Sequence, residues 1–298
     1  MTTGFLTLAF GRMFYRDMAR ALVQSARARG LTLPFAVVTD STDKQFCALF
    51  DLVIPYRKEY GRGVEQKLYL DRYAPFDCTI FVDADSLFFG NPDAVAAYYA
   101  DKPGFVVRSS GYVDRGERYY ALKDVGQFLD ACAVNRLPRF NSGLLAFDRT
   151  DAARAVFEKA RAIFAMRETN GLKEFKTAAV ADEPVFAAAL ASCAAAVYPE
   201  DGTFLAVMSD EKRALDSVSA AVVHFNIFQQ DSYVYARERL RLRFAAVPLL
   251  QWVVEPIART ECFCRNAAAQ AREFLLTRFL FPVWGLFRKL FPKKRKHV

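Results

Sequence analysis

Asp83 and Asp85 are the residues of this chain whose types and spacing are best suited to chemistry. They follow residues 79–82 (Thr-Ile-Phe-Val), a β-branched and aromatic run that predicts a buried strand. If the chain stays extended through Ala84, both carboxylates leave on the same side, because side chains alternate along a strand. Two close carboxylates repel each other unless they share a cation, usually a hard divalent ion such as Mn²⁺ or Mg²⁺. The pair therefore predicts a metal site that holds a diphosphate.

The surroundings of this pair matter, because Asp-x-Asp is also common as a plain strand-to-loop transition with solvated charges. Sixteen positions before Asp83, Lys67 lies in the segment 64–73, whose spacing predicts an amphipathic helix. Downstream, Asn91 and Pro92 have the residue types of a helix cap and of the first helical position. From the residues alone, Lys67 would be a solvated charge on a helix face, as most helical lysines are.

The elements before this segment follow a strand, helix, strand order. Apolar runs at 5–10, 33–39 and 51–55 predict strands, and the helical spacing of 12–29 ends at Gly30. This order predicts an α/β fold with a mainly parallel, doubly wound sheet and a ligand crevice at the carboxyl ends of its strands. A dinucleotide site is not supported, because the chain has no GxGxxG motif. Further elements are expected as strands at 104–108, 144–147 and 220–223 and helices at 122–134, 151–166 and 183–195.

Five short segments, taken in their order, resemble those of nucleotide-sugar-dependent glycosyltransferases of the GT-A fold. They are Lys67, 81–85 (Phe-Val-Asp-Ala-Asp), 140–145 (Phe-Asn-Ser-Gly-Leu-Leu), Asp182-Glu183 and 223–225 (Val-His-Phe). The chain is most similar to family 8, the retaining enzymes that include glycogenin and the bacterial lipooligosaccharide galactosyltransferases, over about residues 1–230. The resemblance implies a Rossmann-like, mixed but mainly parallel sheet flanked by helices.

The resemblance also implies a metal centre. Asp83, Asp85 and His224 would bind Mn²⁺ or Mg²⁺ on the diphosphate of the donor. Ala84 lies between the two aspartates at this donor site, and Lys67 would contact the donor. Imidazole and carboxylates together suit Mn²⁺. Without the resemblance, His224 would be interpreted as an ordinary histidine at the end of an apolar strand.

Asn141 and the pair Asp182-Glu183 match positions at which the family contacts the transferred sugar. There the asparagine faces the donor sugar, and a carboxylate assists the glycosyl cation or binds sugar hydroxyls. The family has a glutamine where this chain has Glu183, which leaves the catalytic part of Glu183 open. From the residues alone, Asn141 belongs to a turn that opens an edge strand, and Asp182 is well placed as the N-cap of the following helix.

Phe10, Gly11, Tyr15 and Asp40 lie at or after the carboxyl ends of the first two predicted strands, where such folds hold a nucleotide. The resemblance makes Tyr15 the candidate for stacking on uracil, with a UDP-sugar as the favoured donor. The alternatives are a tyrosine packed in the core and, for Asp40, a cap of the next turn.

One signature of the family is missing. Related enzymes continue from the histidine to a glycine and a Lys-Pro-Trp whose lysine holds the diphosphate, whereas residues 225–230 here read Phe-Asn-Ile-Phe-Gln-Gln. Neutralisation of the phosphates then falls to the metal, to Lys67, or to an arginine such as Arg237 or Arg239. The identity of the donor stays open for the same reason.

Composition excludes several classes of protein. With 53% hydrophobic and 14% aromatic residues, the 298-residue chain is not mainly disordered. Of its net charge of +8, residues 274–298 supply +7, since they hold seven Lys and Arg and no acid, while the rest carries 34 basic against 33 acidic residues. We therefore expect no nucleic-acid binding. The six cysteines have no disulfide or zinc spacing, and the N-terminus has no leader pattern, so a cytoplasmic location is expected.

The C-terminal residues predict contact with an anionic membrane surface. Residues 274–287 are apolar and aromatic but contain Arg278 and Pro282, and a span needs about 20 apolar residues. Followed by the basic cluster 288–296, they suit the membrane interface, and a core helix with a solvated tail is the alternative. We therefore predict a glycosyltransferase domain at 1–245 and a helical, membrane-associating extension at 246–298, peripheral on the cytoplasmic face.

These features together predict a metal-dependent transferase that moves a hexose from a nucleotide diphosphate sugar to a lipid-linked or surface-glycan acceptor. The resemblance implies retention of the anomeric configuration. A sugar-phosphate nucleotidyltransferase is one alternative, although Gly11-Arg12 is too little for the phosphate loop it needs. The other alternative is a non-catalytic membrane adaptor that keeps the fold and binds neither metal nor nucleotide sugar.

Overall fold

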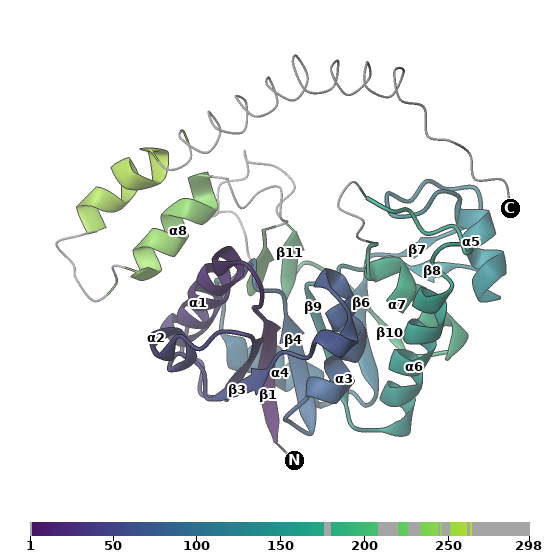
Figure 1. Cartoon of the computed structure of the whole chain (residues 1–298), viewed down its shortest axis with the longest axis horizontal. Helices are drawn as coiled ribbons and strands as arrows, with labels where there is room; N and C mark the ends of the chain where they lie inside the picture. The colour runs from purple at the N-terminus through teal and green to yellow at the C-terminus, as the bar shows by residue number, and fades with distance from the viewer. Residues whose placement is uncertain are drawn as a thin grey trace, which may run out of the picture. The chain divides into compact units, whose positions relative to one another are not determined.

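The computed structural model describes residues 2–175, 180–207, 220–225, 233–243, 245, 251–260 and 263. The chain forms two compact units, residues 1–227 and 228–298. The described strands belong to the first unit, together with helices α1 to α7 (Figure 1). The functional division of the chain at residue 245 stays a prediction.

Among the described residues, seven strands form a central sheet in the order β10-β6-β9-β4-β1-β2-β3. Neighbouring strands are parallel except at β9, which is antiparallel to both β4 and β6. The strands are β1 (Thr3–Leu8), β2 (Phe35–Thr39), β3 (Leu52–Pro55), β4 (Cys78–Val82), β6 (Phe105–Ser109), β9 (Leu144–Asp148) and β10 (Val197–Pro199). The predicted α/β class with a mixed, mainly parallel sheet is confirmed, and β9 lies inside the sheet, not at its edge.

The central strands are buried on both faces, as their continuous apolar sequences predict. Every residue of β2 and β4 is buried, which is typical of parallel strands covered by helices on both sides. Leu6, Phe81 and Leu145 are partners across β1, β4 and β9, and all three belong to one hydrophobic cluster. Phe5 and Ile80, the neighbours of Leu6 and Phe81, point to the opposite face, because side chains alternate along a strand. The sheet therefore separates two apolar layers.

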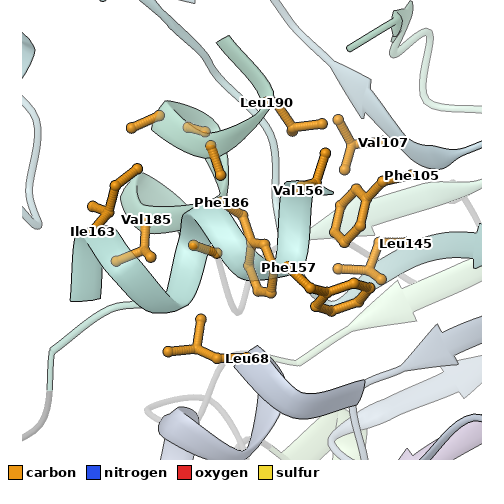
Figure 2. Close-up of a cluster of buried hydrophobic side chains, with 14 of the residues drawn as sticks. Leu68, Phe105, Val107, Leu145, Val156, Phe157, Ile163, Val185, Phe186 and Leu190 are labelled. Carbon is orange, nitrogen blue, oxygen red and sulfur yellow. The ribbon is translucent and has the colours of Figure 1, made fainter. Parts of the chain in front are cut away.

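Helices α6 (Asp151–Ala165) and α7 (Glu183–Ser192) pack against each other in one of these layers. The ring of Phe157, on α6, lies 5.1 Å from that of Phe105 and 5.8 Å from that of Phe186, on α7 (Figure 2). Residues 183–190 of α7 are buried in succession, and its alanines allow neighbouring elements to approach closely. Helix α7 therefore lies in the core. Its first residues lie at the edge of the sheet that carries the candidate site.

A smaller sheet brings a distant part of the chain to the end of β4. Within the described ranges it has three strands, β11 (Leu205–Val207), β12 (Val222–His224) and β5 (Ser86–Phe88), with β12 in the middle. Strand β12 is antiparallel to β5, and His224 pairs with Ser86. Because Ser86 directly follows Asp85, this pairing places His224 beside the aspartates.

The segment that carries Lys67 is not the single amphipathic helix that its spacing predicts. It forms a 3₁₀ helix, η2 (Gly63–Tyr69), followed by the short α3 (Leu70–Tyr73). Gln66 anchors the 3₁₀ turn, since its Nε2 donates to the carbonyl groups of Arg57 and Gly61. These hydrogen bonds tie η2 to the turn before it, and a helical spacing of apolar residues does not predict them.

The other predicted helices of the first unit are present in their predicted order. Asn91 caps α4, and its Oδ1 accepts a hydrogen bond from the Asp93 amide at 2.8 Å, with Pro92 at the first helical position. This predicted cap is confirmed. The elements not yet given are α1 (Met13–Ala28), α2 (Lys44–Cys47), η1 (Lys58–Tyr60), α4 (Pro92–Ala100), β7 (Tyr112–Val113), α5 (Val125–Cys132) and β8 (Leu137–Pro138). Of these, the short elements α2, η1, β7 and β8 were not predicted.

In the second unit the structure describes α8 (Tyr233–Arg243) and a helical stretch over 251–260. Ala236, Leu240, Val254 and Ala258 form a small apolar cluster. Within the described part of the chain, no helix is both long enough and apolar enough to cross a bilayer. The segment 274–298, on which the membrane prediction rests, lies outside the described residues.

Candidate active site

The aspartate pair lies in a tight turn. Strand β4 ends at Val82, and the Ser86 amide donates to the carbonyl group of Asp83 at 3.0 Å, which closes a turn over 83–86 with Ala84 buried inside it. The expectation of an extended chain through Asp83 and Asp85 is therefore wrong. The turn redirects the two side chains, so their directions do not follow from the alternation of side chains along a strand.

The two carboxylates nevertheless converge on His224. Nε2 of His224 lies 3.1 Å from Oδ1 of Asp85 and 3.8 Å from Oδ2 of Asp83. The Phe225 amide donates to the carbonyl group of Asp85 at 2.9 Å, which joins the end of β12 to the turn. One potential ligand atom from each of the three residues lies within 4.8 Å of the others. The structure thus brings together the three residues predicted as metal ligands.

This set of donor atoms fits a divalent cation. Two carboxylates and an imidazole are ligands that suit Mn²⁺, and the carboxylates alone suit Mg²⁺. Burial raises the pKa of Asp83, against the opposing charge of Lys67. Burial lowers the pKa of His224, but the charge and the hydrogen bond of Asp85 outweigh it, so the pKa is raised. The cluster therefore favours a positive charge among its atoms, which a metal ion would supply.

Lys67 is a buried cation bound to two of the predicted site carboxylates. Its Nζ lies 2.8 Å from Oδ2 of Asp83 and 3.2 Å from Oδ2 of Asp182, and it donates to Oγ of Ser142 at 3.2 Å. Burial lowers its pKa, but the charges of Asp182 and Asp83 outweigh the burial and raise it. The interpretation of Lys67 as a solvated charge is wrong, since the residue is only 8% exposed. Its contact with a donor stays a prediction.

Asp182 stands directly before α7 but does not cap the helix with its side chain. Its backbone is already helical, with φ −79° and ψ −29°, and its carboxylate makes no capping hydrogen bond. Pro184, in the first turn of α7, offers no N–H to such a cap. The carboxylate is instead paired with Lys67, so the predicted capping role is corrected and the side chain belongs to the site.

Glu183 is buried and accepts hydrogen bonds at both carboxylate oxygens. Oε1 accepts from Nδ2 of Asn141 at 3.1 Å and from the Ser142 amide at 3.3 Å, and Oε2 accepts from the hydroxyl group of Tyr120. Burial, together with the charge of Asp182, raises the pKa of Glu183. The carboxylate is therefore a fixed part of the loop that carries Asn141.

Asn141 joins this carboxylate to the metal-ligand cluster. Its Oδ1 accepts from the Gly143 amide at 2.9 Å and lies 2.8 Å from Nδ1 of His224. A Cβ at position 143 would lie 2.7 Å from both Oδ1 of Asn141 and Nδ1 of His224. Glycine at this position is therefore what allows the asparagine and the histidine to meet.

The predicted nucleotide residues lie at the same edge of the sheet as Asp83, because β1, β2 and β4 are parallel. The Gly11 amide donates to Oδ2 of Asp40 at 3.0 Å, which ties together the loops after β1 and β2. The cap of α2 is Asp43, whose side chain accepts from the Gln45 amide. Asp40 is therefore not the cap of the next turn, and its contact with a base or ribose stays a prediction.

Phe10 and Tyr15 are the aromatic candidates in this region. The ring of Phe10 stacks on that of Tyr56, with centroids 4.5 Å apart. Tyr15, in the first turn of α1, meets the ring of Phe14 at a centroid distance of 5.7 Å. Phe10 and Tyr15 are both only half-buried, so packing does not use the whole of either ring, and stacking on a base stays a prediction.

Lys67, one of the three side chains named as phosphate contacts, is paired with Asp83. Arg237 and Arg239 belong to α8 of the second unit, where Nε of Arg237 donates to Glu238 at 2.9 Å. Residues 226–230, where the family signature is missing, lie outside the described residues.

Sequence reasoning missed two members of this network, Ser142 and Tyr120. A signal for Ser142 was present, because it lies beside Asn141 in a run of small residues. Tyr120 contacts Glu183 from 63 positions away in the sequence. No local pattern predicts such a contact, which depends on how separate elements pack.

No protein-family model matches this sequence, and no curated protein matches it. Solved structures share its fold. The galactosyltransferase LgtC in complex with donor and acceptor sugar analogues is 13% identical over 75% of this chain and 87% of its own, with a TM-score of 0.50. An active-site mutant of LgtC, in which a glutamine is replaced by glutamate, has a TM-score of 0.51 at the same identity and coverage.

Two further structures come from other glycosyltransferases. The bifunctional glycosyltransferase WbbM is 9% identical over 85% of this chain and 51% of its own, with a TM-score of 0.51. Mouse xyloside xylosyltransferase 1 is 12% identical over 77% of this chain and 99% of its own, with a TM-score of 0.50. At these identities the likeness shows the fold, and the predicted GT-A fold is confirmed.

Proposed function

We propose that this chain is a metal-dependent glycosyltransferase that moves a hexose from a nucleotide diphosphate sugar to a lipid-linked or surface-glycan acceptor. The convergence of Asp83, Asp85 and His224 carries the proposal. It offers metal ligands at the carboxyl end of β4, the edge at which open α/β sheets bind ligands. The fold shared with LgtC, whose structure holds donor and acceptor sugar analogues, supports a sugar donor and a sugar acceptor as substrates. A UDP-sugar is the donor favoured by the family resemblance.

The three ligands would hold Mn²⁺ or Mg²⁺, and the bound ion would stabilise the charge of the leaving diphosphate as a Lewis acid. Lys67 would add positive charge while it holds Asp83 and Asp182 in place. Asn141 and Asp182 would position the donor sugar at the N-terminus of α7. The base and ribose would lie against the loops after β1 and β2, at Phe10, Gly11, Tyr15 and Asp40.

The two carboxylates at the start of α7 do not suit a covalent nucleophile. Asp182 is paired with Lys67, and Glu183 accepts three hydrogen bonds. We therefore propose retention by attack on the same face of the sugar, with the leaving phosphate as the base. An ¹H NMR spectrum of the first product formed would show a retained anomeric configuration, and an inverted one would contradict this part of the proposal.

A thermal-shift panel tests the donor site. Purified full-length protein is heated with UDP, GDP or CMP, each with Mn²⁺ or with EDTA, beside the Asp83→Ala/Asp85→Ala variant. A ligand that binds only the folded state raises the melting temperature by mass action. The expected result is a Mn²⁺-dependent shift with UDP that the variant lacks.

The same panel has an outcome that contradicts the proposal. If no nucleotide shifts the melting temperature of the wild-type protein, with or without Mn²⁺, the transferase proposal fails. A non-catalytic protein that keeps the fold is then the function to pursue.

Residues 274–298 provide the proposed link to the acceptor membrane. Their seven basic residues, at about 1 kcal/mol each near an anionic surface, favour peripheral binding to the cytoplasmic leaflet. Cosedimentation of the full chain with phosphatidylglycerol vesicles should exceed that with phosphatidylcholine vesicles and should fall with added salt. A variant with glutamine at positions 293–296 should bind less, and equal binding by both proteins would contradict the electrostatic contact.

A further inference from the structure

We infer that Glu183 is a positioning residue that acts through Asn141 to hold His224 with Nε2 facing the metal site. The inference deepens the proposed function and rests on it, because it concerns a ligand of the same metal. It assigns Glu183 a part other than that of a nucleophile or a sugar contact.

The orientation of the Asn141 amide is determined by two backbone donors. Oε1 of Glu183 accepts the Ser142 N–H at 3.3 Å, so the Asn141 atom 3.1 Å from that oxygen has to be the donor Nδ2. At the other end, Oδ1 of Asn141 accepts the Gly143 N–H at 2.9 Å. If the amide were reversed, an oxygen would face the carboxylate and an NH₂ group would face a backbone N–H. The amide therefore has one satisfied orientation.

The orientation of Asn141 in turn determines which nitrogen of His224 carries a proton toward it. Oδ1 of Asn141 has no hydrogen, and Nδ1 of His224 lies 2.8 Å away, so Nδ1 is the donor. Nε2, on the other side of the ring, lies 3.1 Å from Oδ1 of Asp85 and is left to bind a cation. Metal-binding histidines usually donate their second N–H to a partner of this kind, which fixes the ring.

Glu183 is itself held from a separate part of the chain. Its Oε2 accepts from the hydroxyl group of Tyr120, in the segment between β7 and α5. A carboxylate can only accept hydrogen bonds, so it receives Nδ2 of Asn141 whichever way it turns. Hydrogen bonds thus connect four side chains in the order Tyr120, Glu183, Asn141 and His224. The last of these is a predicted metal ligand.

The test measures Mn²⁺ affinity of the full-length protein by calorimetry, with no nucleotide present. Five proteins are compared: wild type, Glu183→Ala, Glu183→Gln, Asn141→Ala and the Glu183→Ala/Asn141→Ala double variant. Loss of a partner behind a metal ligand lowers metal affinity by about 10- to 100-fold, and we expect this loss in each alanine variant. The double variant should lose no more than either single one, because the two residues act in series.

Glu183→Gln is the matched control for charge. Its side-chain oxygen still accepts from Asn141 and Ser142, so its Mn²⁺ affinity should stay close to that of wild type. An affinity as weak as that of Glu183→Ala would show that the charge matters and not the orientation, which overturns the inference. Additive losses of Mn²⁺ affinity in the double variant would show that Glu183 affects the metal site through contacts other than Asn141, such as Ser142 and Lys67. This result would also overturn the inference.

A measurement on the wild-type fold makes the test independent of variants that fail to fold. The chain has two histidines, His224 and His297, so the His297→Gln protein gives ¹⁵N imidazole signals of His224 alone. With diamagnetic Zn²⁺ in place of Mn²⁺, we expect the metal on Nε2 and the proton on Nδ1. Metal on Nδ1 would overturn the inference.

The inference and the proposed function fail in different ways. If Mn²⁺ affinities follow the expected series but no nucleotide shifts the melting temperature, the inference holds and the glycosyltransferase proposal fails. If the wild-type protein binds no Mn²⁺, both fail.

Discussion

The two ends of α7 show two ways in which this protein uses buried side chains. At its start, Asp182 and Glu183 join a polar network with Lys67. Further along, Phe186 and Leu190 belong to the apolar cluster between α6, α7 and the sheet (Figure 2). Apolar packing has no direction and depends on buried area and volume, whereas the polar network depends on matching each donor to an acceptor. One helix therefore joins the part that stabilises the fold to the part that is arranged for chemistry.

The polar end also carries features that oppose stability. Burial raises the pKa of Asp83 and of Glu183, so the buried site disfavours their ionised forms. Oδ2 of Asp182 lies 3.2 Å from the Lys67 ammonium but has no hydrogen bond of good geometry. Such unsatisfied groups are typical of sites that bind a ligand, and they predict that the two ends of α7 respond differently to mutation and to metal.

The largest expected effect is that of Phe157→Ala, in the apolar cluster, where this α6 side chain packs against Phe186 of α7. The ring is fully buried against other aromatic rings, and its loss from a packed core costs about 3–5 kcal/mol of unfolding free energy. Urea unfolding measures this loss. The folded variant should keep wild-type Mn²⁺ affinity. A drop of tenfold or more would contradict the independence of the apolar cluster and the polar network.

Lys67→Met, at the polar end, is expected to cost about 3 kcal/mol, the lower limit for breaking a buried ion pair. The lower limit applies because the Asp83 side chain is still 18% exposed to water. Unlike the loss in Phe157→Ala, this one should shrink when Mn²⁺ is added, since the metal binds the folded state and supplies a positive charge. Urea unfolding with Mn²⁺ and with EDTA compares the two. Equal losses in both conditions would contradict the prediction.

Gly143→Ala should affect metal binding more than stability. The added Cβ would lie 2.7 Å from Oδ1 of Asn141 and Nδ1 of His224, so the contact behind the metal ligand has to open. We expect Mn²⁺ affinity to fall by about 10- to 100-fold in calorimetry. The control is Gly126→Ala, in α5, whose Cβ would come closest to the end of the flexible Arg115 side chain. If both variants bind Mn²⁺ as wild type does, the close approach of residue 143 to Asn141 and His224 is not needed for metal binding.

The smallest expected effect concerns pH. The pKa of Glu183 is raised above its ordinary value of 4.5 by burial and by the charge of Asp182, so its proton binds more tightly in the folded state. The stability that this proton contributes is complete below 4.5 and is lost as the pH rises through the pKa of the folded state. Relative to Glu183→Gln, the wild-type protein should therefore lose stability as the pH rises. Urea unfolding in EDTA over a pH series checks this, and a constant difference between the two proteins would contradict it.

The sequence by itself determined most strands of the central sheet and the class of the fold. Continuous apolar runs such as that of β4 reflect burial on both faces, and the types of Asn91 and Pro92 reflect the dihedral angles and the free N–H groups of a helix start. These are local properties, which each segment carries without its neighbours. The resemblance of five short segments then pointed to the GT-A fold, and the shared fold of the solved glycosyltransferases confirmed it.

Only the tertiary structure decided how the site is assembled. The turn at Asp83 replaced an extended chain, the Lys67 ion pair replaced the cap expected at Asp182, and His224 reached the aspartates through the pairing of β12 with β5. The contact between His224 and Asn141 joins residues 83 positions apart. Hydrogen bonds and ion pairs require atoms within a few tenths of an ångström of their best separation. Separate elements reach that accuracy only after the apolar core has packed and set their relative positions.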